Sequence, residues 1–290
     1  MSPLYVKGLI DYGQQSQDPT SPSPTEGSKY WHTGDNRKYV YNGSKWEKLD
    51  AGQLVFDYSN TTHYWPSENI ASTTSWTAEK GGAGANFVAG SGSGEMTYSA
   101  ADSNFNGQKS LTTTAGDTSL RTSTQSEDTY WDGSEAWSVM VVIRKTAQGS
   151  GSGYGDGLFI QTRNSDALGS WSHDITGDHT WGGEFGEVYT SAASYTYPQK
   201  GILLVRMSAN GGSGQMAFHD GSSWSEKATF SSLPSSLPTN MDSINIFNFQ
   251  TASSNHDYIG SIAEIAYYKG TRIDDTERDA FTSYAVSKFW

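Results

Sequence analysis

Apolar and polar residues alternate in many short stretches of the chain, and turn-forming residues separate these stretches. In WSVMVVIRK, residues 137–145, the alternation places Val139, Val141 and Ile143 on one face of an extended strand. About ten such segments follow one another with no helix between them, which predicts an all-β fold, a two-sheet jelly-roll sandwich of concanavalin A-like type. We expect strands at residues 53–59, 110–114, 118–123, 137–145, 157–163, 186–192, 201–209, 214–224, 243–250 and 258–270.

One short helix is expected at the C-terminal end, where apolar residues recur with the period of a helix. Asp274 is a suitable N-cap, and Glu277 three residues later completes a capping box. Lys288 falls in the last turn, where a cation suits the helix dipole. We expect Phe281, Tyr284 and Trp290 to lie against the sandwich. The apolar stripe of the helix comprises Ala280, Phe281, Tyr284 and Ala285.

The first fifty residues are organised differently. Residues 26–50 form a small β-meander module in which Tyr39 and Tyr41 share one face and Trp46 can cover them. Its strands are expected at residues 29–33, 38–42 and 45–49. Two or three strands alone are marginal in water, so the module requires a neighbouring surface.

A stretch rich in Pro, Ser and Thr, QQSQDPTSPSPT, precedes this module at residues 14–25. Such a composition is typical of an extended linker. We therefore divide the chain into an N-terminal attachment arm and linker (1–25), the β module (26–50) and the jelly-roll domain (51–290).

Composition and charge narrow the possible partners. The chain has no cysteine, which excludes disulfides and zinc-thiolate sites. Its net charge is −12, and residues 51–290 carry 13 basic and 25 acidic side chains, so we expect no binding to nucleic acid. We also expect no signal peptide and no membrane insertion, since no basic segment precedes an apolar run and no stretch reaches ~18 apolar residues.

The last thirty-odd residues carry a family resemblance. The stretch YIGSIAEIAYYKGTRIDDTERDAFTSYAVSKFW, residues 258–290, resembles the C-terminal end of concanavalin A-like, laminin-G-like jelly rolls of phage and bacterial surface proteins. A strand, a turn and a short helix follow one another in that pattern. The matching residues are Gly260, Ile262, Ala263, Glu264, Ile265, Glu277, Tyr284, Lys288 and Trp290.

The N-terminal module is similar to a short module of tailed-bacteriophage structural proteins, through its Gly-aromatic strand and the run YVYNGSKW at 39–46. The resemblance implies a virion protein, made in the host cytoplasm and located in the virion. It implies attachment to other virion proteins through the N-terminal arm and a homotrimer, as in phage fibres. The expected function is that of a non-enzymatic tail fibre or adhesin whose lectin-like domain binds a host surface glycan. The alternative is a capsid decoration or head-fibre protein, and a glycoside hydrolase is disfavoured.

Aromatic and polar residues gather in one loop-rich region, residues 170–189. Aromatic rings stack on sugar faces, and carboxylates bind sugar hydroxyls, so this region is the candidate glycan site. The candidate residues are Trp171, Asp174, Asp178, Trp181, Glu184 and Tyr189.

The same region contains acidic residues and histidines, which are candidates for catalysis and for a metal site. Glu184 and Glu187 are three positions apart, so strand alternation places them on opposite faces, whereas glycoside hydrolysis needs two facing carboxylates. This pattern predicts that the protein is not an enzyme. His173, Asp174 and Asp178, with His179 and Glu184, have suitable chemistry for a metal, but a polar surface loop explains them as well. We expect no cofactor; calcium is conceivable but unsupported.

Overall fold

The fold was analysed in a computed structural model. It describes residues 4–6, 9–20, 23–32, 37–41, 43–49, 56–90, 95–115, 118–122, 130, 134–147, 159–163, 166–168, 172–173, 178–183, 186–191, 198–209, 212–230, 243–247 and 258–290. In the strands between residues 159 and 191 it describes the backbone only.

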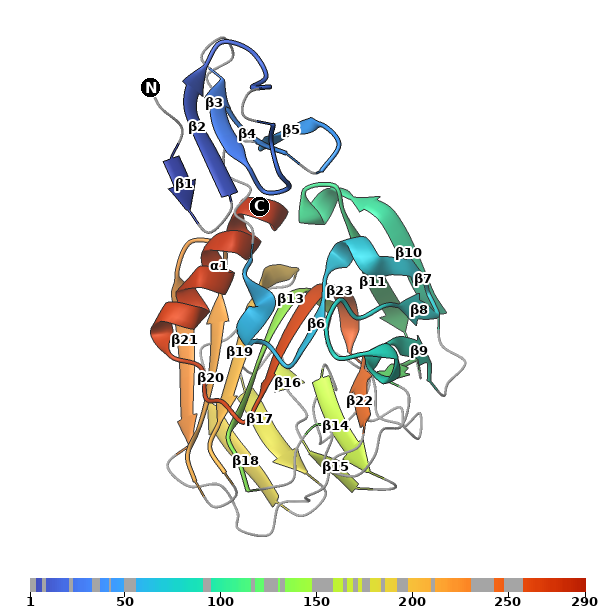
Figure 1. Ribbon diagram of the computed structural model, residues 1–290. Helices are drawn as coiled ribbons and strands as arrows, with labels where there is room; N and C mark the ends of the chain where they lie inside the picture. Colours follow the sequence, from blue (N-terminus) through green and yellow to red (C-terminus); the bar gives the residue numbers. More distant parts are fainter. Residues whose placement is uncertain are drawn as a thin grey trace. The chain divides into compact units, whose positions relative to one another are not determined.

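The chain forms two compact units, Met1–Val55 and Phe56–Trp290. The first holds a five-stranded sheet in the order β1-β2-β3-β4-β5 (Figure 1). Its strands are β1 (Leu4–Val6), β2 (Leu9–Gln15), β3 (Lys29–His32), β4 (Arg37–Tyr41) and β5 (Trp46–Leu49). The last three are the three strands expected for the small module.

The structure differs from the expected arm and linker at residues 1–25. β2 runs to Gln15 and pairs in parallel with β3, so the segment before residue 16 belongs to the same sheet as the module. Tyr30, on β3, is only 1% exposed, because Trp46 and Tyr39 pack on its ring. The module was expected to require a neighbouring surface, and at Tyr30 its own Trp46 and Tyr39 supply the cover.

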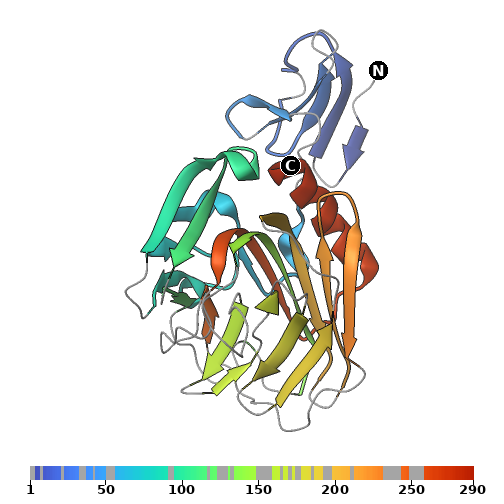
Figure 2. The same cartoon turned by 180° about the vertical axis from the view of Figure 1, so that it is seen from behind.

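The second unit is a sandwich of two sheets with one C-terminal helix, which confirms the expected all-β jelly-roll class (Figures 1 and 2). One sheet, which we call the back sheet, has the order β10-β11-β23-β13-β19-β20-β21, and β6 also pairs with β23. Its strands are β6 (His63–Trp65), β10 (Glu95–Asp102), β11 (Gln108–Ala115), β13 (Trp137–Ala147), β19 (Gln199–Met207), β20 (Gly214–His219), β21 (Trp224–Phe230) and β23 (Ile259–Lys269).

The other sheet, which we call the front sheet, has the order β16-β17-β15-β14-β22-β12-β9-β8-β7, and β18 pairs with β17. Its strands are β7 (Ile70–Ser72), β8 (Ser75–Trp76), β9 (Phe87–Ala89), β12 (Leu120–Thr122), β14 (Phe159–Arg163), β15 (Asp166–Leu168), β16 (Ser172–His173), β17 (Asp178–Gly183), β18 (Gly186–Ser191) and β22 (Ser243–Ile246).

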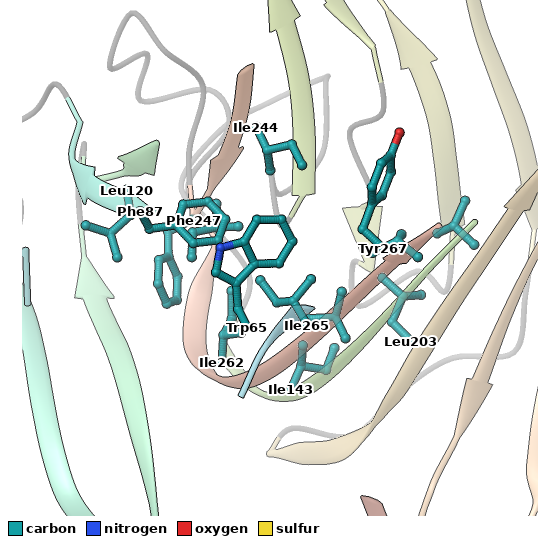
Figure 3. Packing of buried hydrophobic residues seen from close by; sticks show 14 of the residues in the cluster. Trp65, Phe87, Leu120, Ile143, Leu203, Ile244, Phe247, Ile262, Ile265 and Tyr267 are labelled. Atoms are coloured by element: carbon teal, nitrogen blue, oxygen red, sulfur yellow. The ribbon is translucent and has the colours of Figure 1, made fainter. Parts of the chain in front are cut away.

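The main core lies between the two sheets. The expected alternation is confirmed in β13, where Val139, Val141 and Ile143 face this core. Figure 3 shows Ile143 and Leu203 of the back sheet near Trp65, with Ile244 of the front sheet beside them. The indole N–H of Trp65 donates to the carbonyl of Ala85 at 2.7 Å, so this large ring is buried without losing its hydrogen bond.

A second core lies on the opposite face of the back sheet, under the helix α1 (Asp275–Phe289). Met140, Val142 and Leu204 contribute to it from β13 and β19, and Phe281 of α1 packs edge-on against Phe56, with ring centroids 5.0 Å apart. The expected helix is confirmed, and Asp274 caps it by accepting a hydrogen bond from the backbone N–H of Glu277 at 2.9 Å.

Two expected details of the C-terminal part are corrected, and a third is confirmed. The Glu277 carboxylate accepts hydrogen bonds from Tyr268 (3.2 Å) and Asn60 (3.3 Å), because the back sheet and the segment after Phe56 lie within its reach, so the capping box is half formed. Ala280 is exposed, since the buried face of α1 continues through Phe289. Trp290 lies against the sandwich as expected, with its ring centroid 4.3 Å from Nζ of Lys200 on β19 and its indole next to Gly221, while 37% of the residue stays exposed.

The expected strand at residues 53–59 is also corrected. Residues 53–55 lie outside the described part, and Tyr58–Asn60 forms a short 3-10 helix, η1, because the Asp57 side chain caps it by accepting from the Ser59 N–H at 2.9 Å. Further 3-10 turns are η2 (Ser67–Asn69), η3 (Ala83–Ala85) and η4 (Ser103–Phe105). Strands as short as β6 to β9 were missed because three residues carry no measurable period.

Candidate functional site

The candidate glycan region lies at one edge of the front sheet, on β16, β17 and β18. Trp171, Asp174 and Glu184 lie outside the described residues. Asp178 and Trp181 are on β17, and Tyr189 is on β18. For these three the backbone register decides which face of the sheet each position occupies.

The register can be followed outward from a residue of known burial. Ile244 of β22 is fully buried in the main core and stands opposite Gln161 of β14. Gln161 in turn pairs with Leu168, and Leu168 pairs with Gly183 of β17. Directly paired positions share a face, so position 183 belongs to the core-facing side of the front sheet.

Alternation along β17 then separates the candidates. Position 181 shares the core-facing side with position 183, whereas position 178 lies on the outer side. Thr180 pairs with Tyr189, which places Tyr189 on the outer side as well. The register thus brings positions 178 and 189 to one side of the sheet, which we call the outer β17–β18 face, and position 181 to the other side.

A second cluster of chemically active groups lies between the back sheet and α1. Val142 pairs with Glu264 and Ile143 pairs with Ile262, so Ala263 is an extra residue, a β-bulge in β23. The bulge turns Glu264 away from the main core, toward α1. Sequence reasoning missed this cluster, although a single glutamate inside the apolar run SIAEIAYY signals that a buried charge needs a partner.

Lys288 is that partner. Its Nζ lies 2.6 Å from Oε2 of Glu264, 2.8 Å from Oε1 of Glu68 and 2.7 Å from the hydroxyl of Tyr284. Three acceptors match the three N–H groups of an ammonium, so the buried charge is fully satisfied. The Tyr64 hydroxyl donates to Oε1 of Glu264. Burial raises the pKa of Glu264, and the Lys288 ammonium acts against that rise.

The cluster contains two carboxylates, those of Glu264 and Glu68, and an active site for hydrolysis has the same composition. Glu264 is fully buried and Lys288 is 2% exposed, so no substrate reaches the carboxylate of Glu264. Glu264 of β23 and Glu68 of η2 tie Lys288 to the rest of the second unit, and Tyr284 supports it from within α1. The role that the geometry supports is therefore to fix the C-terminal helix.

His63, on β6, is a further buried titratable group. Its imidazole is stacked on the ring of Trp65, with centroids 5.6 Å apart, and lies 4.9 Å from the ring of Tyr130. Burial, together with the positive charges of Lys269 and Lys80, lowers the pKa of His63 to about 4. The imidazole is therefore neutral at pH 7.

The described part of the chain holds no group of three His, Asp or Glu side chains arranged to ligate a metal ion. The conceivable metal ligands at residues 173–184 are not tested by this, because their side chains are outside the description. In the same described part, no helix has the length and apolar character of a membrane span.

No protein-family model matches the chain, and no curated protein matches it significantly. The fold is similar to that of a sialidase from Trypanosoma rangeli solved with sialic acid, at a TM-score of 0.54 and 8% identity, over 90% of this chain and 45% of that one. At this identity the likeness concerns the fold alone.

Two other similar structures have TM-scores below 0.5. One is an arabinofuranosidase complexed with arabinofuranosyl-α-1,2-xylobiose (TM-score 0.49, 14% identity, 91% of this chain and 58% of that one). The other is domain 4 of an extracellular arabinanase from Geobacillus stearothermophilus complexed with arabinotriose (0.46, 13%, 79% and 98%). The chain spans about half the length of the sialidase and of the arabinofuranosidase.

These structures correct the expectation that the protein is not an enzyme. That expectation rested on the absence of a catalytic carboxylate pattern, and it is wrong as a deduction from this fold, because the similar structures include enzymes, among them the sialidase. Glu184, one of the two carboxylates used to exclude catalysis, lies outside the described residues, so its position relative to Glu187 offers no support either.

Proposed function

We propose that the protein is a phage virion component that binds a host surface glycan through the outer β17–β18 face. The observation that carries this proposal is the shared face of Asp178 and Tyr189, which gives one carboxylate and one aromatic ring at neighbouring strands. A sugar is bound by this combination, with the ring on its apolar face and the carboxylate on its hydroxyls.

The two faces of the sandwich also differ in what covers them. The outer face of the back sheet is occupied by α1 and the second core, so it offers no free surface along β13 and β19. Among the described elements, no helix packs on the front sheet. The outward positions Ser243 and Asn245 of β22 are nevertheless buried, so the proposal concerns the β17–β18 edge of this sheet and not its centre.

The charge of the jelly-roll region favours a neutral glycan. Residues 51–290 carry 25 acidic and 13 basic side chains, so an anionic polysaccharide would be repelled over most of the surface. The virion context rests on the resemblance of the N-terminal module and of residues 258–290 to phage structural proteins.

The experiment is adsorption of the purified protein to host cells, with Tyr189→Ala compared with the unchanged protein. We expect the variant to lose about 5- to 150-fold in affinity, since one stacked sugar contributes about 1–3 kcal/mol by analogy with base stacking on aromatic rings. Trp290→Ala is the matched control, because Trp290 is an exposed aromatic residue at the end of α1.

Equal adsorption by both variants and the unchanged protein would contradict the assignment of the face. If the unchanged protein binds no host surface and electron microscopy finds it on the capsid, the alternative role in capsid decoration is supported. Release of sugar from the cell surface during the assay would identify the outer face as an active site.

A further inference from the structure

The aromatic cluster of the first unit is occupied by the chain's own Asp18–Pro19 segment. The indole N–H of Trp46 donates to the carbonyl of Pro19 at 3.1 Å, and Pro19 itself is buried. The hydroxyl of Tyr30 donates to the carboxylate of Asp18. An indole N–H on a carbonyl beside a buried proline is the way aromatic grooves hold proline-rich peptides.

The strand that precedes this segment is attached in an unusual way. β2 pairs with β3 in parallel, although the two strands are neighbours in sequence. A parallel pair cannot be closed by a tight turn, and it normally requires a long crossover. β3, β4 and β5 form a local antiparallel meander. The arm, which comprises β1, β2 and Asp18–Pro19, is covalently connected to this meander by residues 20–24.

The connection, residues 20–24, is anchored on both sides. Before it, Asp18 and Pro19 contact Tyr30 and Trp46. After it, two backbone hydrogen bonds hold residues 27 and 28. The Gly27 N–H donates to the Tyr41 carbonyl at 2.8 Å, and the Tyr41 N–H donates to the Ser28 carbonyl at 2.9 Å. Residues 20–24, TSPSP, contain two prolines, which favour an extended chain. Six steps from Pro19 to Thr25 at ~3.1 Å each reach about 19 Å in a fully extended chain.

We propose that this arm, residues 4–19, is exchanged between copies of the chain, so that Asp18 and Pro19 of one copy occupy the Tyr30–Trp46 seat of another. The contacts are the same within one chain and between chains, so exchange gains association without any new surface. Exchange of an element between copies takes place at short hinge segments, and residues 20–24 are such a segment. This proposal is independent of glycan binding.

The absence of cysteine from the chain makes a direct test possible. Asp11 of β2 is the register partner of Lys29 of β3. Asp11→Cys is placed on one full-length chain and Lys29→Cys on another that carries a tag. The two chains are co-expressed and treated with a short bismaleimide, which tolerates imperfect geometry. Exchange predicts a covalent heterodimer.

Two controls define the result. A single chain with both substitutions shows that the linker reaches between β2 and β3. Val40→Cys and Glu47→Cys on separate chains report the β4–β5 hairpin, which a tight turn closes and which is expected to give no heterodimer. If the doubly substituted chain is cross-linked and the separate Asp11→Cys and Lys29→Cys chains give no heterodimer, each arm stays on its own module and the proposal is overturned.

Trp46→Phe tests whether the contact of Trp46 with Pro19 holds the exchanged arm. This variant keeps an aromatic ring but removes the N–H that binds the Pro19 carbonyl. If the seat holds the exchanged arm, the yield of Asp11–Lys29 heterodimer falls several-fold after brief dilution into excess untagged protein, because the arm leaves its seat faster. An unchanged yield would show that Asp18 and Pro19 do not hold the exchanged arm in place.

Discussion

The Nζ of Lys288, near the end of α1, lies 2.6 Å from Oε2 of Glu264, in the middle of β23, and both side chains are at most 1% exposed. Desolvation of two charges is costly, and the attraction between them offsets this cost only when every remaining donor and acceptor is also bonded. Here Tyr64, Tyr284 and Glu68 supply those bonds. The pair therefore fixes the position of α1. Loss of any one partner would leave a buried donor or acceptor without its bond.

Removal of one member of this pair should be strongly destabilising. We expect Lys288→Met, which keeps most of the side-chain volume, to lower the free energy of unfolding by about 3–5 kcal/mol, because Glu264 is left as an unpaired buried charge. Urea unfolding at pH 7, followed by tryptophan fluorescence, measures the loss. A decrease below about 1 kcal/mol would mean that water reaches Glu264 in the variant.

The matched control for this prediction is Lys288→Met combined with Glu264→Gln. The double variant contains no charge at either position, so it should recover part of the loss of the single variant. If the double variant is no more stable than Lys288→Met, packing of the lysine stem, and not the charge of Glu264, explains the effect.

Phe281 should contribute through packing alone. Its side chain is fully buried in the second core, against Phe56. Phe281→Ala removes the ring and leaves a cavity, so we expect a loss of about 3–5 kcal/mol in the free energy of unfolding. Ser283→Ala, at an exposed position of the same helix, should change it by less than about 0.5 kcal/mol. An unchanged melting temperature for Phe281→Ala would show that α1 is peripheral.

His63 should make the second unit sensitive to acid. The pKa of His63 is about 4 in the folded protein and 6.5 in the unfolded chain, so the unfolded state binds the proton more readily. The stability contributed by the neutral imidazole is fully present above pH 6.5 and is lost as the pH falls toward 4. The total loss is about 3 kcal/mol, at 1.36 kcal/mol for each pKa unit.

The measurement is the free energy of unfolding in urea at several pH values between 7 and 4. His63→Phe, which keeps an aromatic ring beside Trp65, is the comparison, because it removes the titrating group. We expect the stability of the unchanged protein to fall more steeply with acid than that of the variant. Parallel curves would assign the acid sensitivity to other groups.

The long strands and the helix were predictable from sequence because their signals are local. In β13 and β19 the continuous apolar runs 139–143 and 202–205 mark the strands, and in α1 the N-cap Asp274 stands at the expected place. The resemblance at residues 258–290 also pointed to Glu264, Tyr284 and Lys288. Their mutual contact was not predictable, because it depends on the bulge at Ala263 and on a helix that returns to the sheet.

For the candidate glycan residues, the sequence did not show which face of the sheet each one occupies. Loop composition selected Trp181 and Tyr189 together, but position along a strand decides the face, and the strand boundaries were not visible in the sequence. Only the pairing of β17 with β15 and β18 separates position 181 from position 189. The prediction of an arm and linker at residues 1–25 missed β2 for a related reason. The partner of β2 is a strand that begins at Lys29, beyond a proline-rich segment.

Deletion of residues 1–25 should affect the two units differently. The second unit has its own two cores, built from residues after Phe56, so we expect its melting temperature to stay unchanged. The first unit loses β1, β2 and the cover that Asp18–Pro19 provides for Trp46 and Tyr30, so its remaining three strands should no longer form a stable sheet. Calorimetry of the full chain and the deletion variant separates the two transitions.

The same deletion also tests the role of the arm in attachment. We expect the shortened protein to remain soluble and to be absent from assembled virions. Asp18→Ala combined with Pro19→Ala is the control that keeps both strands while it weakens their seat, and it should reduce incorporation without abolishing it. Normal incorporation of the deletion variant would contradict attachment through residues 1–25, and a melting temperature of the second unit lowered by several degrees would contradict its independence.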